Sequence, residues 1–324
     1  TALQHFTGSK EHNVKLRKIA KEKGYKLNEY GLYKMKNNEK EKIKVDSEKK
    51  LYDKLGLDYI IPELREDEGE IEAASNSNLP ALIKTEDIKG DLHIHSRFSD
   101  GAFSMDDMVK EALKRRYQYI AITDHSQSLR VAHGMSTEKV YHQRKKIDEL
   151  RDKYTQIKIL NGIEVDILND GTLDYSDEIL AGFDIVIASI HTGFKQSESQ
   201  ITNRIIKAME NSYVDIIAHP QGRILARRKS YNVNMEKVIS FADKTNTALE
   251  INASPNRLDL DAKMARKAAK NNVKLVVNTD AHHIKQLSDM RLGVNVARRA
   301  WLEKEDLLNV MEYNDLKDFL NKGN

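Results

Sequence analysis

Nine side chains that can bind divalent cations fall at or just beyond the ends of short apolar runs. They are His93, His95, Asp100, His125, Glu164, His191, His219, Asp280 and His282. The chain has no Cys, which excludes disulfides and thiolate zinc sites, so a bound metal must be held by His, Asp or Glu. Nine such groups exceed the four to six ligands that one ion needs. We therefore expect two or three divalent ions, with Glu164 as the carboxylate that bridges a pair.

The spacing of these residues predicts which of them point the same way. In the HIH segment, His93 and His95 lie two residues apart, so the period of a strand sends both imidazoles to one side. Asp280 and His282 repeat this spacing. By the same alternation Asp124 points away from the cluster, which predicts a supporting or hydrogen-bonding role for it instead of metal ligation.

Hydrolysis is the chemistry that suits such a cluster, because grouped ions make water nucleophilic near neutral pH and stabilise a departing oxygen. Phosphate esters are the expected substrates, since their charged oxygens complement the cations. The candidate catalytic residues are Glu164, His191 and Asp280. Arginine is suited to bidentate phosphate contact, and the candidate substrate-binding residues are Arg223, Arg227, Arg228 and Arg257. A solvated run of charge is the alternative interpretation of these arginines.

Seven short apolar runs, each followed by a stretch of helical periodicity, must position these side chains. The runs begin at Asp91, Tyr119, Lys158, Asp184, Val214, Ala248 and Lys274. Strands that alternate with helices form a parallel sheet with helices outside it, and seven repeats favour a closed or nearly closed α/β barrel over an open sheet. The carboxyl ends of barrel strands meet on one face, where active sites lie. All the runs except the sixth, which ends at Asn252, bring a candidate ligand to that face.

Residues 1–67 are organised differently from the region that follows. Two helix patterns and two strand candidates, at residues 25–35 and 42–45, predict a small α/β module. Residues 68–90 contain an acidic segment and a loop-like stretch, which indicates a linker. The barrel domain is then expected to occupy residues 91–324.

Composition and charge add a few expectations about environment and partners. The net charge of +3 identifies no partner, but residues 1–50 hold 14 Lys or Arg against 7 Asp or Glu, a surplus that could face a polyanion. The sequence has no apolar stretch of about 18 residues and no signal pattern, so we expect a cytoplasmic protein. The chain begins at Thr1 within a structured pattern, which indicates a piece of a longer protein.

Six motifs in the barrel region match those of a known family. The segments DLHIHSRFSDG, ITDH, GIEVD, SIH, IAHP and NTDAH, in this order, resemble the PHP (polymerase and histidinol phosphatase) family from residue 91 to about residue 300. The resemblance implies a distorted (β/α)7 barrel, similar to a TIM barrel, with a trinuclear site of the Zn or Mn type. It implies that the first ion is held by His93, His95, Glu164 and Asp280, the second by Glu164, His191 and His219, and the third by Asp100, His125 and His282.

The N-terminal module resembles the thumb, or nucleotide-binding, subdomain of family X DNA polymerases in the segments HFTGSKEHNVKLR and KLNEYGLY. This resemblance implies that Phe6 and Gly8 lie at the nascent base pair. It also implies that Asn13 and Arg17 approach the minor-groove side of nucleotide and template. His5 departs from the Tyr usual in this motif.

A thumb followed by a PHP barrel is the order found in bacterial family X polymerases. The resemblance implies a manganese-dependent 3′ to 5′ exonuclease, with related 3′-phosphatase and abasic-site activities, in a DNA repair polymerase. DNA and the polymerase portion of the parent chain are the implied partners. Residues 1–90 lack the catalytic aspartates of a polymerase palm, so we do not expect this chain to synthesise DNA.

Two alternatives remain at this point. A small-molecule phosphatase of the histidinol phosphatase type shares the barrel and the ligands but has no need of a thumb. A domain that only scaffolds a polymerase is the other alternative, although such a domain is expected to have lost ligands. The sequence does not choose between Zn²⁺ and Mn²⁺, because histidines suit the first ion and the added carboxylates suit the second.

Overall fold

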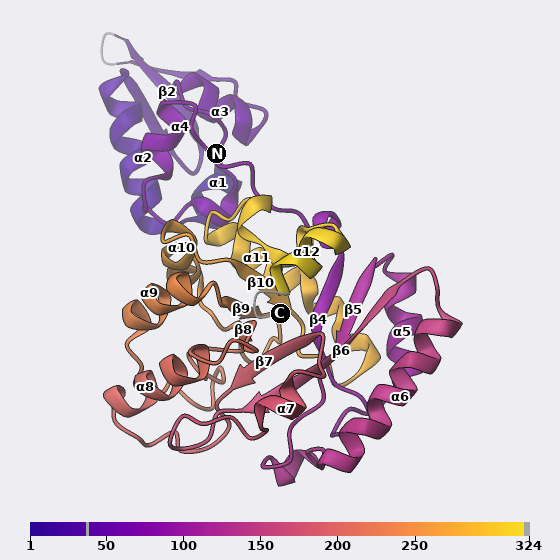
Figure 1. Cartoon of the computed structure of the whole chain (residues 1–324). Coiled ribbons are helices and arrows are strands. Elements are labelled where there is room, and N and C mark those ends of the chain that lie inside the picture. The colour runs from indigo at the N-terminus through magenta and orange to yellow at the C-terminus, as the bar shows by residue number, and fades with distance from the viewer. Residues whose placement is uncertain (37–38, 321–324) are drawn as a thin grey trace. The chain divides into compact units, whose positions relative to one another are not determined.

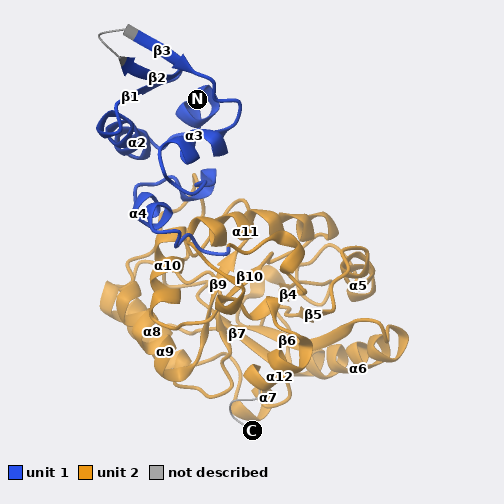
Figure 2. Ribbon diagram, turned by 90° about the horizontal axis from the view of Figure 1, so that it is seen from above, with its two compact units in different colours: residues 1–81 blue, residues 82–324 orange. Residues whose placement is uncertain are grey.

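The computed structural model describes residues 1–36 and 39–320. The chain divides into two compact units, Thr1–Ala81 and Leu82–Asn324, which are coloured separately in Figure 2. Each unit has its own buried core, and each is described by itself below. Among the described helices, none is both long enough and apolar enough to cross a membrane.

Unit 1 combines short helices with a three-stranded antiparallel sheet in the order β1-β2-β3. Its elements are α1 (Ala2–Thr7), α2 (Lys10–Glu22), β1 (Tyr25–Asn28), β2 (Gly31–Lys36), β3 (Glu39–Ile43), α3 (Glu48–Lys54), the 3-10 turn η1 (Pro62–Leu64) and α4 (Glu70–Ser75). The Ser9 hydroxyl caps α2 by accepting from the backbone N–H of His12. Leu16 and Ala20 on the same helix are fully buried, so α2 contributes to the core of the unit.

The strand candidate at residues 25–35 is a hairpin of two strands, not one strand. The Asn28 side chain accepts hydrogen bonds from the backbone N–H groups of Tyr30 and Gly31, at 3.1 Å each, and so closes the turn between β1 and β2. Apolar periodicity runs through such a tight turn without interruption, which is why the pattern looked continuous.

The segment predicted as a linker, residues 68–90, is folded. Its first part forms α4, in which Glu70, Ile71 and Ala74 are buried within unit 1. Its last part belongs to unit 2, where Ile83 and Ile88 join the main apolar core. The structure divides the chain between Ala81 and Leu82, where the acidic and loop-like composition gave no sharp signal.

Unit 2 is built on seven parallel strands in the order β10-β9-β8-β7-β6-β5-β4, as Figure 1 shows. They are β4 (Gly90–Ile94), β5 (Tyr119–Ile122), β6 (Lys158–Asp166), β7 (Ile185–Ser189), β8 (Ile216–Ile217), β9 (Ala248–Asn252) and β10 (Leu275–Asn278). The edges β4 and β10 approach each other through a parallel bridge between Ile94 and Ala281, and His95 N–H donates to the Ala281 carbonyl at 2.9 Å. The predicted seven-strand, nearly closed barrel of the α/β class is confirmed.

Helices cover the outside of this barrel. They are α5 (Met105–Lys114), α6 (Thr137–Lys153), α7 (Asp177–Leu180), α8 (Glu198–Met209), α9 (Met235–Thr245), α10 (Ala262–Lys270) and α11 (Met290–Arg299), whereas α12 (Tyr313–Leu320) packs against the inner cluster of the barrel. Short 3-10 turns link them: η2 (Thr85–Asp87), η3 (Arg130–Ala132), η4 (Ile284–Asp289), η5 (Lys304–Asp306) and η6 (Leu308–Val310). Leu308 of η6 and Leu316 of α12 pack among inward-facing strand residues, so the C-terminal segment contributes to the interior.

Strand alternation separates an inner apolar cluster from an outer one. Along β6, Leu160 belongs to the inner cluster, whereas Ile163 and Val165 belong to the outer cluster beneath the helices. Glu164 lies four residues beyond Leu160 and therefore shares the inner face, nearer the carboxyl end of the strand. The barrel interior is thus apolar at one end and polar at the other.

Candidate metal centre

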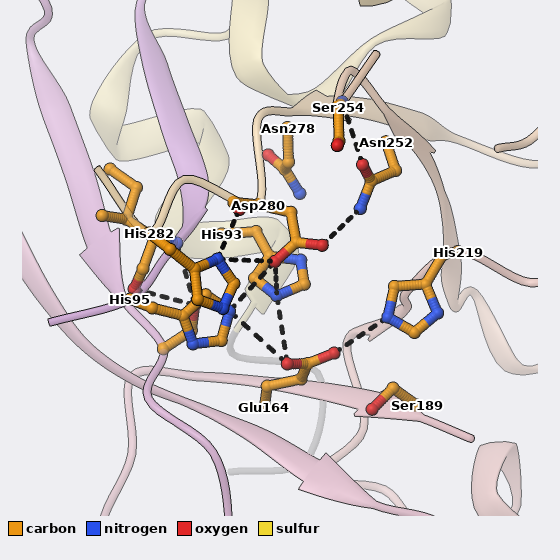
Figure 3. A network of polar contacts seen from close by, with 12 residues as sticks. His93, His95, Glu164, Ser189, His219, Asn252, Ser254, Asn278, Asp280 and His282 are labelled. Atoms are coloured by element: carbon orange, nitrogen blue, oxygen red, sulfur yellow. Dashed lines mark hydrogen bonds and ion pairs between the residues drawn. The ribbon is translucent and has the colours of Figure 1, made fainter. Parts of the chain in front are cut away.

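The structure brings all nine predicted ligands together at the carboxyl ends of the barrel strands. His93 lies in β4 and Glu164 in β6, and the others follow the ends of β4, β5, β7, β8 and β10 within a few residues. A register shift between Asp91 and Ile94 in β4 lets Leu92 join the inner apolar cluster while the HIH imidazoles also face the barrel mouth. Figure 3 shows several of these side chains converging on Glu164.

Glu164 lies at the centre of the cluster, and its two oxygens face different histidines. Oε2 lies 2.8 Å from His125 Nδ1, 3.4 Å from His93 Nε2 and 3.5 Å from His95 Nε2. Oε1 lies 3.0 Å from His219 Nε2. A carboxylate whose two oxygens face separate sets of donors has the geometry of a bridging ligand.

Two aspartates complete the cluster on the side of β4 and β10. Asp280 Oδ1 lies 3.1 Å from His95 Nε2 and 3.6 Å from His93 Nε2. Asp100 Oδ1 lies 3.2 Å from His282 Nε2. Three groups have donor atoms within 4.8 Å of one another: His93, His95 and Asp280; His125, Glu164 and His191; and His95, Asp100, His125 and His282.

The hydrogen bonding of the buried polar atoms indicates whether this cluster fits cations. Five imidazole nitrogens on His93, His95, His125 and His219, together with Glu164 Oε2, are buried without an aligned hydrogen bond among the described residues, although Oε2 and His125 Nδ1 lie only 2.8 Å apart. A buried polar atom without a partner costs about 1–3 kcal/mol, so a protein rarely leaves several in one place. Cation coordination satisfies these lone pairs, and the donor set therefore fits divalent metal ions.

Burial and neighbouring charge set the protonation of the cluster. Burial alone would raise the pKa of Glu164, but the charges of His125 and other imidazoles hold that pKa well below its usual range. Burial, with the charges of His282 and His125, lowers the pKa of His95 well below its usual value. Burial would also lower the pKa of His282, yet the hydrogen bond from its ring to Asp100 and the charges of Asp280 and Asp100 together outweigh this effect and raise the pKa to about 9. Glu164 is therefore ionised and His95 neutral, the forms that bind cations, whereas a cation bound by His282 would have to displace the proton of its ring.

Two carboxylates behind the cluster orient its histidines, and neither was predicted from the sequence. Glu250 in β9 accepts from His93 Nδ1 at 2.7 Å. Asp166 in β6 accepts from His191 Nδ1 at 2.6 Å and from the Ser128 hydroxyl at 2.6 Å. These bonds direct the Nε2 atoms of both rings toward the centre. The available signal was spacing, because Asp166 lies two residues beyond Glu164 and so shares its side of the strand.

Backbone strain is concentrated at the centre. His219 and Asp280 adopt φ angles of 32° and 54°, a left-handed region that costs a residue other than glycine about 1–3 kcal/mol. Polar contacts hold both in place, since His219 N–H donates to Glu250 Oε2 at 2.9 Å and Asn252 Nδ2 donates to Asp280 Oδ2 at 3.0 Å. Asn252 ends the one strand without a predicted ligand, and it serves the cluster through this bond.

Asp124 lies outside the cluster, as its position in the strand predicted. Its carboxylate is fully buried and accepts from the backbone N–H and hydroxyl groups of Ser96 and Ser99 and from Gln143 Nε2. These bonds fix the loop between β4 and α5, which carries Asp100. Asp124 is a hydrogen-bonding residue that supports a ligand loop.

The four candidate arginines are placed in two different ways. Arg228 and Arg257 line a cavity of about 320 Å³ whose walls include Glu164 and Asp280. Arg257 Nε lies 3.4 Å from Asp280 Oδ2, and its Nη1 atom is buried without a hydrogen-bond partner among the described residues.

The other two arginines do not line this cavity within the described part of the chain. Arg223 donates through its guanidinium to the carbonyls of Arg257 and Leu258, which ties two loops together. Arg227 is exposed. Arg223, Arg227 and Arg228 share one loop, so the sequence does not distinguish them, although their side chains point differently.

The thumb candidates occupy the N-terminal end of unit 1. Phe6 is 79% exposed, and Gly8 has a φ of 78°, a left-handed conformation that favours glycine. Asn13 is buried, where its Oδ1 accepts from Gln4 at 2.6 Å and its Nδ2 donates to a backbone carbonyl. Arg17 is exposed. Phe6 and Arg17 are therefore accessible to a ligand, whereas most of the polar capacity of Asn13 is used within the unit.

A parallel barrel with a histidine and carboxylate cluster at the carboxyl ends of its strands defines the class: an α/β-barrel, metal-dependent hydrolase. Residues 91–254 match the model of the PHP domain, and residues 2–66 match the model of the DNA polymerase beta thumb. The chain belongs to the PHP domain family. In this chain the PHP region follows a region that matches a polymerase thumb.

Relatives of two kinds support this assignment. A Bacillus subtilis (strain 168) protein named DNA polymerase/3′-5′ exonuclease PolX is 49% identical over 324 residues, and the chain spans 56% of that relative's length. A protein of Thermoanaerobacter sp. (strain X514), named a probable phosphatase, is 32% identical over 241 residues, which cover 71% of this chain and 93% of that protein. A Listeria monocytogenes structure assigned to histidinol phosphatase superposes with a TM-score of 0.51 at 18% identity, over 61% of this chain and 97% of that one, and shows the shared fold.

Proposed function

We propose that this chain is a metal-dependent phosphoesterase that acts on DNA 3′ ends as a 3′ to 5′ exonuclease of a DNA repair polymerase. Removal of 3′-phosphates and processing of abasic sites are further reactions of the same centre. The observation that carries the proposal is the set of unpaired, buried donor atoms around Glu164. The match of residues 2–66 to a polymerase thumb in the same chain directs the proposal toward DNA.

The proposed ligands are the nine residues of the cluster, with Glu164 between two ions and with two or three divalent ions in all. Mn²⁺ is the proposed ion for activity, and the histidine-rich donor set also accepts Zn²⁺. When bound, such ions supply Lewis acidity that makes water nucleophilic near neutral pH and stabilises charge on a leaving oxygen.

The chain's own residues bind and orient the substrate and the centre. Arg257 offers a buried Nη1 donor without a partner in the cavity wall, and Arg228 lines the same wall, so both are proposed to bind a phosphate group. His191 is fixed by Asp166, and Asp280 is fixed by Asn252. With Glu164, these two make up the proposed catalytic set, because their donor atoms face the cavity and their positions are fixed from behind.

The thumb is proposed to bind DNA. The accessible Phe6 and Arg17, with the turn at Gly8, form the proposed contact with nucleotide and template, while Asn13 holds α1 and α2 together behind them. A polymerase portion of the parent chain is the second proposed partner. Residues 1–50 carry the positive charge that a phosphate backbone requires.

One observation favours a second candidate function. The barrel alone matches relatives named as probable phosphatases over most of their length, with 93% of one of them covered. A small phosphomonoester could use the same ions and arginines. This alternative gives no role to the thumb, which is why it ranks second.

A 5′-labelled single-stranded oligonucleotide incubated with Mn²⁺ separates the two functions. The proposal predicts a ladder of products shortened from the 3′ end, and His93→Ala should abolish it while His142→Ala, an exposed histidine outside the cluster, keeps it. Turnover of small phosphomonoesters with no laddering would overturn the proposal. Arg257→Ala should raise KM for the oligonucleotide and reduce the dependence of KM on salt, because one phosphate contact is lost.

A further inference from the structure

The cavity over the metal centre has a polar wall and an apolar wall. Glu164 and Asp280 belong to the polar wall, and Leu129, Val131 and Phe194 line the same cavity. Val131, in η3, is 89% exposed. An apolar side chain this exposed beside a charged centre has no folding role, because it buries almost no surface.

The exposed position of Val131 is built into the loop. Met135 N–H donates to the His125 carbonyl at 2.8 Å and Leu129 N–H donates to the Ser126 carbonyl at 3.2 Å, so both ends of the loop are tied to the short segment that follows β5. A Cβ atom on Gly134 would lie 1.9 Å from the Ser126 carbonyl oxygen, so only glycine permits this close approach. The loop therefore holds Val131 at the rim of the cavity.

A stack of planar groups forms another part of the wall. The Arg228 guanidinium lies 3.9 Å from the centre of the Phe194 ring, and Phe194 is stacked on Tyr231 with ring centres 6.2 Å apart at 13°. Arg228 Nε also donates to the Gly222 carbonyl at 3.0 Å. Arg228 and Tyr231 both pack against the Phe194 ring and hold it in place, so this part of the cavity wall is a rigid unit made of a guanidinium and an aromatic ring.

The two walls together define the chemical class of the substrate. A phosphate bound by Arg257 and the centre would have the apolar residues beside it in a single cavity of about 320 Å³. A small, wholly polar phosphomonoester leaves this apolar surface in contact with water. A flat heteroaromatic ring joined to the phosphate through a sugar covers it, and a cavity at the small end of the usual range for ligand sites suits one nucleotide.

We propose that Leu129, Val131 and Phe194 form a subsite for the base of the 3′-terminal nucleotide, beside the phosphate site. The proposal rests on the proposed function and deepens it, because it makes the terminal base part of recognition. It favours stepwise removal of intact nucleotides, and it places abasic 3′ ends among the weaker substrates.

Ligand binding tests the subsite without catalysis. Calorimetry on the Mn²⁺-loaded chain compares thymidine 5′-monophosphate with 1,2-dideoxyribose 5-phosphate, in which a hydrogen atom replaces the base and the sugar ring stays closed. The expected result is about tenfold tighter binding of the nucleotide, within the range of base stacking on apolar and aromatic side chains. Equal affinity of the two ligands would overturn the subsite.

Variants locate the effect. Val131→Asn changes a side chain that is 89% exposed, so the fold should be kept, and it should remove most of the difference between the two ligands. Phe194→Leu keeps apolar volume but loses the ring, and it should reduce the difference. Tyr141→Ala, an exposed apolar change on α6 outside the cavity, should keep the tenfold difference. A full difference in Val131→Asn and in Phe194→Leu would contradict the assignment of these residues.

Cleavage gives a second arm that separates the two proposals. Oligonucleotides that end in thymidine or in a tetrahydrofuran abasic residue are compared, and the thymidine end should be removed about tenfold faster. Equal rates would count against the subsite. If neither oligonucleotide is cut, the proposed exonuclease fails, while the affinity comparison still decides whether a base is recognised.

Discussion

Each unit of this chain contains a buried histidine against a carboxylate, but the two arrangements differ in how their polar atoms are satisfied. In unit 1, His12 is bonded on both sides, by Glu70 Oε1 at 2.6 Å and by the Tyr52 hydroxyl at 2.8 Å. In unit 2, neither ring nitrogen of His95 makes an aligned hydrogen bond among the described residues, although its Nε2 lies 3.1 Å from Asp280 Oδ1. Unpaired buried nitrogens, and not the presence of buried histidine, mark a metal centre.

His12 and Glu70, called the thumb pair below, belong to a network of hydrogen bonds within unit 1. Both oxygens of Glu70 are used, since Oε1 also accepts from Asp67 N–H and Oε2 accepts from Glu68 N–H. This carboxylate therefore fixes the chain just before α4 as well as His12. The network holds elements of one unit together and leaves no donor or acceptor directed at a ligand.

The largest effect is expected from removing the charge at the centre of the cluster. Glu164→Gln keeps the shape of the side chain but loses the charge that faces several histidines. Losing several kcal/mol of transition-state stabilisation lowers the rate by about a thousandfold or more. The measurement is kcat/KM on the labelled oligonucleotide with Mn²⁺. Glu149→Gln, an exposed glutamate on α6, is the control. A loss of less than about tenfold would show that Glu164 does not bridge ions.

Breaking the thumb pair should affect stability. His12→Ala leaves the Glu70 charge buried without its partner, and such losses cost about 3–5 kcal/mol. Amide hydrogen exchange of the whole chain should report faster opening of α2, while the strands of the barrel stay protected. His5→Ala is the control because this histidine is only partly buried. Unchanged protection of α2 in the His12 variant would remove the contrast between the two units.

Glu250 offers a test of the supporting carboxylates. Glu250→Gln weakens the charge-assisted bond to His93 Nδ1, and loss of such support lowers metal affinity or activity by about 10–100-fold. Metal affinity measured by competition with a chelator is a readout that a purely structural role would leave unchanged. Glu305→Gln, at an exposed position, serves as the control. Equal metal affinity in the two variants would assign Glu250 to the fold alone.

Acid should weaken the thumb pair, with the smallest effect of the series. Burial would raise the pKa of Glu70, but its hydrogen bonds with His12 and with backbone N–H groups lower it below the ordinary 4.5. Because the pKa of Glu70 is lower in the folded chain than in the unfolded chain, the ionised form of Glu70 stabilises the fold. This contribution is fully present above about pH 4.5, the unfolded pKa, and is lost as the pH falls through the folded pKa. Hydrogen exchange of α2 should therefore accelerate below pH 4.5 in the native chain and change less in Glu70→Gln. Equal acceleration of exchange in the native chain and in Glu70→Gln would show that other groups cause the loss of stability in acid.

The clustering of the nine candidate ligands could be predicted from the sequence because two simple periodicities determine where they lie. Strand alternation directs His93 and His95 to one side, and the parallel barrel brings the ends of distant strands to one face. The same alternation placed Asp124 outside the cluster, where it bonds to serine groups of a neighbouring loop. These predictions needed only residue type and spacing.

The remaining features depend on geometry that spacing does not contain. Glu250 lies within a strand and gives no chemical signal until its distance to His93 is known. Arg223 and Arg228 share one loop, and only the path of that loop directs one guanidinium to backbone carbonyls and the other into the cavity. The unit boundary at Ala81 depends on the packing of α4, which its acidic sequence concealed.

Anomalous diffraction from crystals of the Mn²⁺-loaded chain tests the central claim most directly. The account predicts two or three peaks within coordination distance of the nine residues, with Glu164 oxygens shared between two of them. Elemental analysis of the same preparation should give the same number of ions per chain. The absence of peaks at the carboxyl ends of the barrel strands, with the unpaired imidazole nitrogens bonded only to water, would contradict it.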